Sequence, residues 1–192
     1  MKTFLDTETT GLKPGHIAQL TYILTDDDLQ IQKTQNLFFK IPEGSMEEGA
    51  QNVHGLYEEV LNDLSNGKSF SQHAFRILKD LQNRQLICHN VEFDYNFLEA
   101  EFDECGIQYY PDNFCTMSAF TDICKLPPKP GKTGFKWPRL SETLEFLKIT
   151  PEEVLEKTLE IFGESNGFHD SRFDTTGLFM IYKKGKEMGL IE

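Results

Sequence analysis

The stretch FLDTETTGL, residues 4–12, has the pattern of a buried strand that ends in two carboxylates and a Thr-Thr-Gly turn. In a strand the side chains of residues i and i+2 point to the same face, so Asp6 and Glu8 lie together while Leu5 and Thr7 face the other way. Two carboxylates this close repel each other unless a divalent cation lies between them or one of them keeps its proton. A strand end exposed to water is the alternative explanation, because Asp-x-Glu is a common sequence.

The composition is typical of one globular domain. The 192 residues are 39% hydrophobic and 12% aromatic, which is enough for a sizeable core. Nineteen Lys and Arg residues against 31 Asp and Glu residues give a net charge of -12, so a nucleic-acid partner needs metal ions or a local basic patch. The four cysteines form no CxxC pair, and neither a signal segment nor a membrane-length apolar run is present. The sequence therefore predicts a reduced, cytoplasmic protein without membrane contact.

Strand-like runs come first in the chain, and helical patterns alternate with them afterwards. The predicted strands are residues 2–7, 16–26, 30–40 and 85–88. Helical spacing of apolar residues occurs over residues 70–82, 91–105, 141–148, 152–162 and 171–188. The acidic triplet 26–28 is typical of a hairpin turn, which predicts an antiparallel meander of three strands followed by helical crossovers.

The best-defined helix boundaries are those of the segment that begins at Thr150. Thr150-Pro151-Glu152-Glu153 has the form of a capping box with proline at the first helical position. Gly163 is placed to end this helix.

A second polar group occurs in CHNVEFDYNFL, residues 88–98, where a predicted strand leads into a helix. Asn90 is a good N-cap candidate, and Asp94 falls in the first turn. Complementing the helix dipole is a sufficient explanation for Asp94 taken alone.

A third group is GFHDSRFD, residues 167–174, at the start of the last predicted helix. Asp170 is placed to cap this helix, Asp174 lies in its first turn, and His169 falls just outside it. A single histidine is more often a structural hydrogen-bonding residue than a catalyst.

Together the three groups resemble the motifs of the DEDDh 3'-to-5' exonucleases, the family typified by the proofreading epsilon subunit of bacterial DNA polymerase III. FLDTETTGL resembles the first motif, HNVEFD at 89–94 the second, and His-x4-Asp at 169–174 the third. RLSETLEFLKI at 139–149 is similar to the helix before the third motif, and Val-His-Gly-Leu at 53–56 to a Val-His-Gly-Ile segment. The resemblance implies a ribonuclease H-like α/β fold, with a mixed five-stranded sheet of three antiparallel and then parallel strands flanked by helices, in a single exonuclease domain spanning residues 1–192.

The resemblance also implies hydrolysis of phosphodiester bonds with two divalent ions. Carboxylate oxygens suit Mg2+, for which Mn2+ can substitute. In the family pattern Asp6 bridges both ions, Glu8 and Asp174 complete the site of the ion that holds the attacking water, and Asp94 supports the second ion. His169 accepts a proton from that water, which an ordinary imidazole pKa of about 6.5 permits near neutral pH.

Substrate contacts are assigned by the same resemblance. Thr9 and Leu12 contact the terminal nucleotide, with Leu12 as an apolar wedge against the bases, and Phe93 stacks on a base. His54 resembles a residue that contacts the substrate phosphate or terminal sugar, although a capping or packing role is a live alternative. Apolar contacts of this kind tolerate any base sequence, which favours a single-stranded or frayed 3' end.

Residues 125–139, KLPPKPGKTGFKWPR, form the most obvious loop in the sequence because they are rich in Pro, Gly and Lys and contain no acid. The cations beside Phe135 and Trp137 are suited to attract phosphate. An ordinary surface loop, with aromatics packed on the core and lysines in solvent, explains the composition equally well. The predicted helix at 150–163 departs from the family pattern, because it lengthens the segment between RLSETLEFLKI and the third motif. It offers a further surface for substrate or a partner.

We therefore expect a 3'-to-5' exonuclease that releases nucleoside 5'-monophosphates from single-stranded or frayed DNA. An exoribonuclease resembling oligoribonuclease or ribonuclease T is the first alternative, because these motifs do not reveal discrimination of the 2'-hydroxyl. The Thr-Thr-Gly after Glu8 favours DNA. A non-catalytic nucleic-acid-binding scaffold is the second alternative, and the intact acids and His169 argue against it. No sequence feature directly supports a polymerase or another protein partner.

Overall fold

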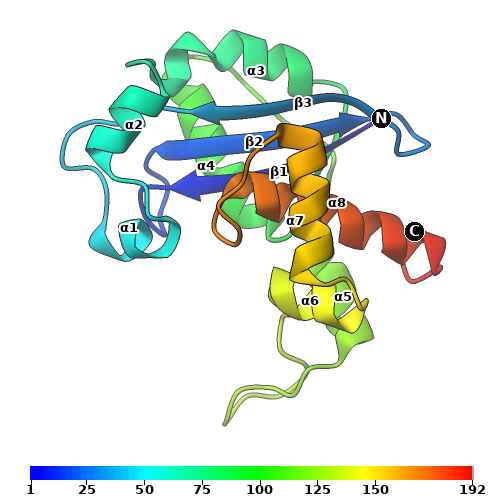
Figure 1. Cartoon of the computed structure of the whole chain (residues 1–192). Coiled ribbons are helices and arrows are strands. Elements are labelled where there is room, and N and C mark those ends of the chain that lie inside the picture. Colours follow the sequence, from blue (N-terminus) through cyan, green and yellow to red (C-terminus); the bar gives the residue numbers. More distant parts are fainter. Residues whose placement is uncertain (192) are drawn as a thin grey trace.

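A mixed five-stranded sheet forms the centre of the structure, a computed structural model that describes residues 1–191 (Figure 1). Its strands are β1 (Lys2–Thr9), β2 (Ile17–Thr25), β3 (Ile31–Phe38), β4 (Gln85–Cys88) and β5 (Asn113–Cys115), in the order β3-β2-β1-β4-β5. β1, β2 and β3 pair antiparallel as a meander, whereas β4 pairs parallel to β1 and β5 parallel to β4. The predicted ribonuclease H-like architecture is confirmed.

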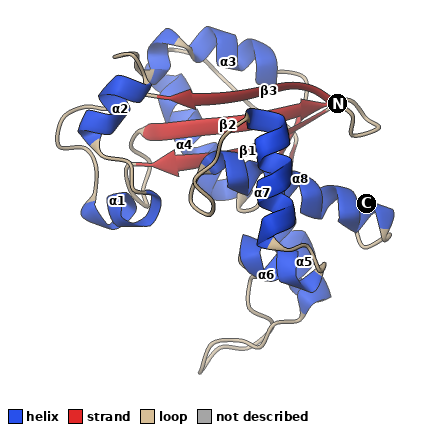
Figure 2. Ribbon diagram, viewed as in Figure 1, coloured by secondary structure: helices blue, strands red, loops and turns tan. Residues whose placement is uncertain are grey.

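Helices cover both faces of this sheet (Figure 2). They are α1 (Glu48–His54), α2 (Glu58–Leu64), a short 3-10 turn η1 (Phe70–Gln72), α3 (Ala74–Leu81), α4 (Val91–Glu104), α5 (Thr116–Cys124), α6 (Leu140–Phe146), α7 (Pro151–Phe162) and α8 (Ser171–Glu187). The connection from β3 to β4, the strand that pairs parallel to β1, contains α1 to α3, and α4 connects β4 to β5. Helical crossovers therefore follow the meander, as predicted.

The sequence prediction differs from the structure where segments lack apolar periodicity. The predicted helix over 70–82 is divided at His73 into η1 and α3. The sequence did not predict α1, α2, α5 or β5. Helix α1 buries none of its side chains and α2 buries only Leu61, so neither carries an apolar stripe. β5 has three residues, which is too short for an alternating pattern.

The alternation of β1 side chains fixes which helices meet which face. Leu5 belongs to the core that packs under α3 and α4, whereas its neighbour Phe4 belongs to the core under α6, α7 and α8. The Phe4 ring centroid lies 5.2 Å from that of Phe179 and 5.3 Å from that of Tyr182, both on α8. Helix α8 therefore lies directly against the strand that carries Asp6, and its N-terminus lies at the end of that strand.

The caps predicted for α7 and α8 are present. The Thr150 hydroxyl accepts the Glu153 backbone N–H at 3.2 Å, the Glu153 carboxylate accepts the Thr150 N–H at 2.7 Å, and Gly163 ends α7 with φ of 80°. Asp170 caps α8 by accepting the Arg172 N–H at 3.1 Å. The α4 N-cap is Asn90, as predicted, but its side chain makes no capping hydrogen bond.

Two observations concern the expected lack of membrane contact and the expected reduced cysteines. Within residues 1–191, none of the helices has both the length and the apolar character needed to span a bilayer. The four cysteines are free thiols.

Candidate active site

Three carboxylates from two elements converge at the end of β1. Asp6 and Glu8 come from the strand, and Asp174 comes from the first turn of α8. Each offers an oxygen, and these oxygens all lie within 4.8 Å of one another. Glu8 is buried, with 8% of its surface exposed, while Asp6 and Asp174 are partly open to a cleft of about 580 Å³. The packing of α8 against β1 therefore produces a compact group of oxygen ligands.

Asp94 approaches the same cleft from α4 on the other face of the sheet. Its Oδ1 accepts the Thr7 backbone N–H at 3.0 Å and the Thr7 hydroxyl at 2.8 Å. Thr7 points away from Asp6 and Glu8, as the strand alternation predicts, and this orientation lets it hold Asp94. Asp94 lines the cleft together with Asp6 and Asp174 but is not part of the three-oxygen group.

His169 lies on the lip of this cleft, immediately before α8. Its backbone adopts a left-handed conformation with φ of 62°, which non-glycine residues adopt uncommonly. The His169 backbone N–H donates to Asp174 Oδ2 at 3.1 Å, so the turn fixes the carboxylate and presents the exposed ring together. The neighbouring Phe168 also lines the cleft, and its ring packs against Phe173 with centroids 4.6 Å apart.

A further acid beside the cleft, Asp170, has its own partners. It is 3% exposed and accepts hydrogen bonds from the Arg172 guanidinium at 2.8 to 3.2 Å and from the Gln19 amide at 3.1 Å. Burial alone raises the pKa of Asp170, but the Arg172 hydrogen bonds outweigh this and hold the pKa below its ordinary value. Arg172 also forms an ion pair with Glu164. This buried pair anchors the start of α8 without adding a free carboxylate to the cleft.

Burial raises the pKa of each of the other four acids when no cation is near. Burial raises the pKa of Glu8 to about 9, and the charges of Asp174, Asp170 and Asp94 add to the effect. Burial likewise raises the pKa of Asp174 and of Asp94 to about 7 each, although the Thr7 hydrogen bonds limit the rise at Asp94. Burial and the surrounding carboxylates raise the pKa of Asp6 well above its ordinary value.

The raised pKa values of these four acids and their oxygen donors both fit a divalent cation. Four acids whose negative charges are disfavoured by burial and by one another gain most when a cation replaces their protons. The donor set consists of carboxylate oxygens, which are the ligands preferred by Mg2+ and Mn2+.

The predicted substrate-contact residues Thr9, Leu12, His54 and Phe93 line one pocket of about 400 Å³ beside the cleft. Thr7 and Phe93 line both the pocket and the cleft, so the two cavities adjoin. Leu12 is 85% exposed on the loop after β1. The Thr9 hydroxyl closes the start of that loop by donating to the Gly11 carbonyl at 2.9 Å.

Both ring nitrogens of His54 are engaged with the backbone. Nδ1 accepts the Leu56 N–H at 3.0 Å, so Nε2 carries the proton that is donated to the Thr9 carbonyl 3.1 Å away. Burial lowers the pKa of His54, which favours the neutral ring. Gly55, with φ of 71°, ends α1 directly after it. These contacts supply the capping role that the sequence left open, and the ring still lines the pocket.

Sequence reasoning gave no role to His89, which links the cleft to the loop over 125–139. Its Nε2 donates to the Pro138 carbonyl at 3.0 Å, and its Nδ1 lies 3.0 Å from the Thr116 hydroxyl oxygen. Burial lowers the pKa of His89 to about 4, so the ring is neutral at physiological pH. Arg139 and Ser141, which follow Pro138, line the cleft as well. No local sequence pattern predicts these contacts, because they join segments far apart in the chain.

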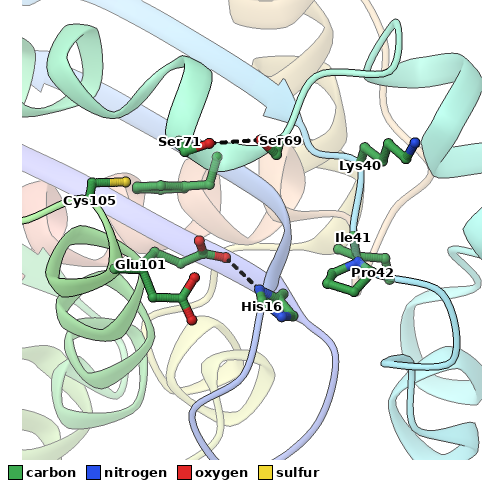
Figure 3. Close-up of a pocket in the computed structure, with 10 residues that line it drawn as sticks. His16, Lys40, Ile41, Pro42, Ser69, Ser71, Glu101 and Cys105 are labelled. Atoms are coloured by element: carbon green, nitrogen blue, oxygen red, sulfur yellow. Dashed lines mark hydrogen bonds and ion pairs between the residues drawn. The ribbon is translucent and has the colours of Figure 1, made fainter.

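A second group with cation-binding geometry lies in another pocket of about 440 Å³ (Figure 3). His16, Glu101 and Glu104 offer ligand atoms within 4.8 Å of one another. Glu101 Oε1 accepts the Ile17 N–H at 3.0 Å and lies 3.5 Å from His16 Nδ1. These contacts give the buried Glu101 a structural role at the start of β2, next to the register shift between β1 and β2.

A ribonuclease H-like sheet whose central strand ends among four acids and a histidine defines the DEDDh class of nucleases. Comparison with known proteins agrees with this class. Residues 3–150 match the model of the family described as Exonuclease, and the chain belongs to this family. The resemblance to the DEDDh exonucleases is thereby confirmed.

Curated relatives include DNA polymerase III epsilon subunits. That of Buchnera aphidicola is 30% identical over 138 residues, which cover 67% of this chain and 56% of the relative. That of Haemophilus influenzae is 27% identical over 137 residues, which cover 67% of this chain and 51% of the relative. The chain thus spans about half the length of the curated relatives it matches.

Solved structures share the fold. Escherichia coli exonuclease I in complex with a dT13 oligonucleotide superposes with a TM-score of 0.72 at 20% identity, over 97% of this chain and 41% of that one. The nuclease domain of 3'hExo, a DEDDh family member bound to rAMP, gives a TM-score of 0.66 at 14% identity, over 97% of this chain and 92% of that domain.

Proposed function

We propose that the protein is a metal-dependent 3'-to-5' exonuclease that releases nucleoside 5'-monophosphates from single-stranded or frayed DNA. The observation that carries the proposal is the meeting of Asp6, Glu8 and Asp174 within 4.8 Å, with Asp94 beside them. Family membership makes an exonuclease the first activity to test.

The acids divide between two ion positions in this proposal. Asp6, Glu8 and Asp174 would hold one Mg2+, and Asp6 with Asp94 would hold a second. When bound, such ions neutralise the phosphoryl group, lower the pKa of the attacking water and stabilise the leaving oxygen. The carboxylates must lose their protons as the ions bind, so ion affinity rises with pH.

His169 is the proposed general base. Its exposed ring on the lip of the cleft would accept the proton of the attacking water at a ring nitrogen. The hydrogen bond from the His169 backbone to Asp174 couples the position of the base to that of a ligand. A shift of this turn would therefore disturb both groups together.

The pocket beside the cleft is the proposed site of the terminal nucleotide. Leu12 would separate the last bases, Phe93 would stack on one of them, and Thr9 would contact the terminal nucleotide. His54 would hold the Thr9 carbonyl in place, because its Nε2 already donates there. Contacts of this kind read no base sequence and require an unpaired end.

The similarity to polymerase III epsilon subunits and to exonuclease I bound to an oligonucleotide favours DNA as the polymer. The fold shared with 3'hExo, solved with rAMP, keeps RNA as the second candidate. A DNA polymerase is the first protein partner to test, since the relatives are polymerase subunits.

The decisive experiment incubates 5'-labelled single-stranded DNA, RNA and a mismatched duplex with the protein and Mg2+. We expect a ladder of progressively shorter labelled DNA and release of nucleoside 5'-monophosphates. Asp6→Ala and a chelator should each abolish the ladder. Glu104→Gln is the matched control, because it alters the second cation-binding group and should leave hydrolysis unchanged. Shortening of RNA alone would favour the exoribonuclease, and binding without cleavage would favour the scaffold.

A further inference from the structure

The loop over residues 125–139, here called the basic loop, has a charge opposite to that of the protein as a whole. It contains Lys125, Lys129, Lys132, Lys136 and Arg139 and no acid, in a chain of net charge -12. Among residues 1–191, Lys136 forms an ion pair with Glu142, and the other four cations have no acidic partner within 4.0 Å. Unpaired positive charge is therefore concentrated in one short segment.

The basic loop also exposes aromatic surface. Trp137 is 68% exposed and Phe135 is 44% exposed, although side chains of this size are usually largely buried. The adjacent Pro138 is tied to His89 through its carbonyl, so the exposed Trp137 stands next to a fixed point of the backbone. Exposed aromatics among unpaired cations are the combination that binds single-stranded nucleic acid, through stacking and phosphate attraction.

The loop has internal order and projects from the molecule. It extends away from the sheet between α5 and α6 (Figure 2). The Lys136 N–H donates to the Leu126 carbonyl at 3.0 Å, which joins the two arms. A turn at the tip places the Lys132 N–H 3.0 Å from the Lys129 carbonyl.

A groove of about 700 Å³ runs along this loop and meets the cleft. Lys129, Lys132, Phe135 and Trp137 are among the residues that line it. His89 and Arg139 line both the groove and the cleft that contains Asp94. Because the cleft also adjoins the pocket beside Leu12, three cavities follow one another across the surface.

We propose that the basic loop binds the single-stranded nucleic acid on the 5' side of the scissile phosphate. This inference rests on the proposed function, in which the terminal nucleotide occupies the pocket beside Leu12. The remaining strand must then leave the cleft in the other direction, where the groove begins at Arg139. Phosphates lie along the lysines, and bases stack on Trp137 and Phe135.

The test compares a long and a short substrate. The long substrate is a 5'-fluorescent oligonucleotide, and the short one is the p-nitrophenyl ester of thymidine 5'-monophosphate, which does not extend into the groove. For the double variant Lys129→Ala/Lys132→Ala we expect kcat/KM on the oligonucleotide to fall about tenfold, with less dependence on salt. The slope of log kcat/KM against log salt should decrease in magnitude by roughly 1.4, since each phosphate contact contributes about 0.7 for a single strand.

Trp137→Ala tests the stacking contribution separately. KM for the oligonucleotide should rise about 5- to 100-fold, the usual range for loss of one stacked base, while hydrolysis of the ester is retained.

The matched control for the double lysine variant is Lys68→Ala/Lys79→Ala, which removes the same charge from exposed positions. Lys79 belongs to α3, at the opposite end of the molecule from the basic loop (Figure 1), so this variant should behave as wild type.

Binding measured by fluorescence anisotropy separates the two proposals. If the wild type binds the oligonucleotide without cleaving it and the loop variants bind more weakly, the exonuclease assignment fails and the binding role of the basic loop stands. The loop proposal is overturned if its variants bind and cleave the oligonucleotide as the wild type does. It is equally overturned if they lose activity on the ester to the same extent, because the loop would then act on the active site itself.

Discussion

Replacing Asp174 with asparagine should stabilise the metal-free protein above neutral pH while abolishing hydrolysis. The introduced amide would still have an oxygen to accept the His169 N–H, so the turn before α8 should keep its geometry. The substitution would remove one negative charge from a group in which Asp6 and Glu8 also lie. It therefore isolates the electrostatic cost of holding the acids together without a cation.

The magnitude follows from the pKa of Asp174, which rises from 3.8 to about 7 on folding. The folded state then binds more protons than the unfolded state between about pH 4 and 7, so stability of the metal-free protein falls as pH rises through this range. A pKa difference of this size corresponds to about 4 kcal/mol at pH 8, and water in the open cleft reduces this to roughly 2 kcal/mol. For a chain of this length that is a rise in Tm of about 4 to 8 °C.

The assay is thermal unfolding of wild type and Asp174→Asn in a chelator at pH 8 and pH 5. We expect the variant to be more stable at pH 8, with a smaller difference at pH 5, where the wild-type carboxyl is protonated. Added Mg2+ should raise the Tm of the wild type far more than that of the variant. Asp122→Asn, an exposed position on α5, is the control and should change stability by no more than about 0.5 kcal/mol. A variant Tm at or below that of the wild type at pH 8 would refute the reasoning.

Three further substitutions test separate parts of the site. His169→Ala should lower kcat by about 10²-fold or more while Mn2+ affinity stays within a few-fold, and unchanged turnover would remove its role as the base. Thr7→Val removes the hydroxyl that donates to Asp94 at 2.8 Å and should weaken metal binding about 10- to 100-fold in calorimetry, whereas Thr7→Ser should restore it. Equal affinity in the Thr7→Val variant would show that the backbone N–H alone holds Asp94. Phe93→Ala should raise KM for an oligonucleotide about 5- to 100-fold with less effect on kcat, and an unaltered KM would exclude stacking there.

The parts of the fold that the sequence predicted well are those set by local chemistry. The capping box at Thr150 needs only residues within one turn, and the alternation of β1 follows from strand geometry. The same alternation placed Asp6 and Glu8 on one face. Their meeting with Asp174 depends on how α8 packs on β1, and it was expected from the resemblance of the motifs rather than from periodicity.

The parts that the sequence did not predict depend on contacts between distant segments. Thr7 holds Asp94 across 87 positions in the chain, and His89 binds the Pro138 carbonyl across 49. Nothing near Thr7 or His89 in the sequence identifies these partners. Helix α1 was not predicted for a different reason. It buries no side chain, so its sequence shows no helical periodicity of apolar residues.

The lack of buried side chains in α1 has a further consequence for the pocket beside the cleft. One wall of that pocket is β1, which is embedded in the core, and the other includes Ala50, Val53 and His54 of α1. Segments with few buried apolar contacts open locally at low free energy, so the amides of α1 should exchange hydrogen far faster than those of α8, most of which is buried. In the proposed function, a wall that opens easily opposite a rigid one would let the pocket accept terminal nucleotides of different size, while the acids on β1 and α8 keep their spacing.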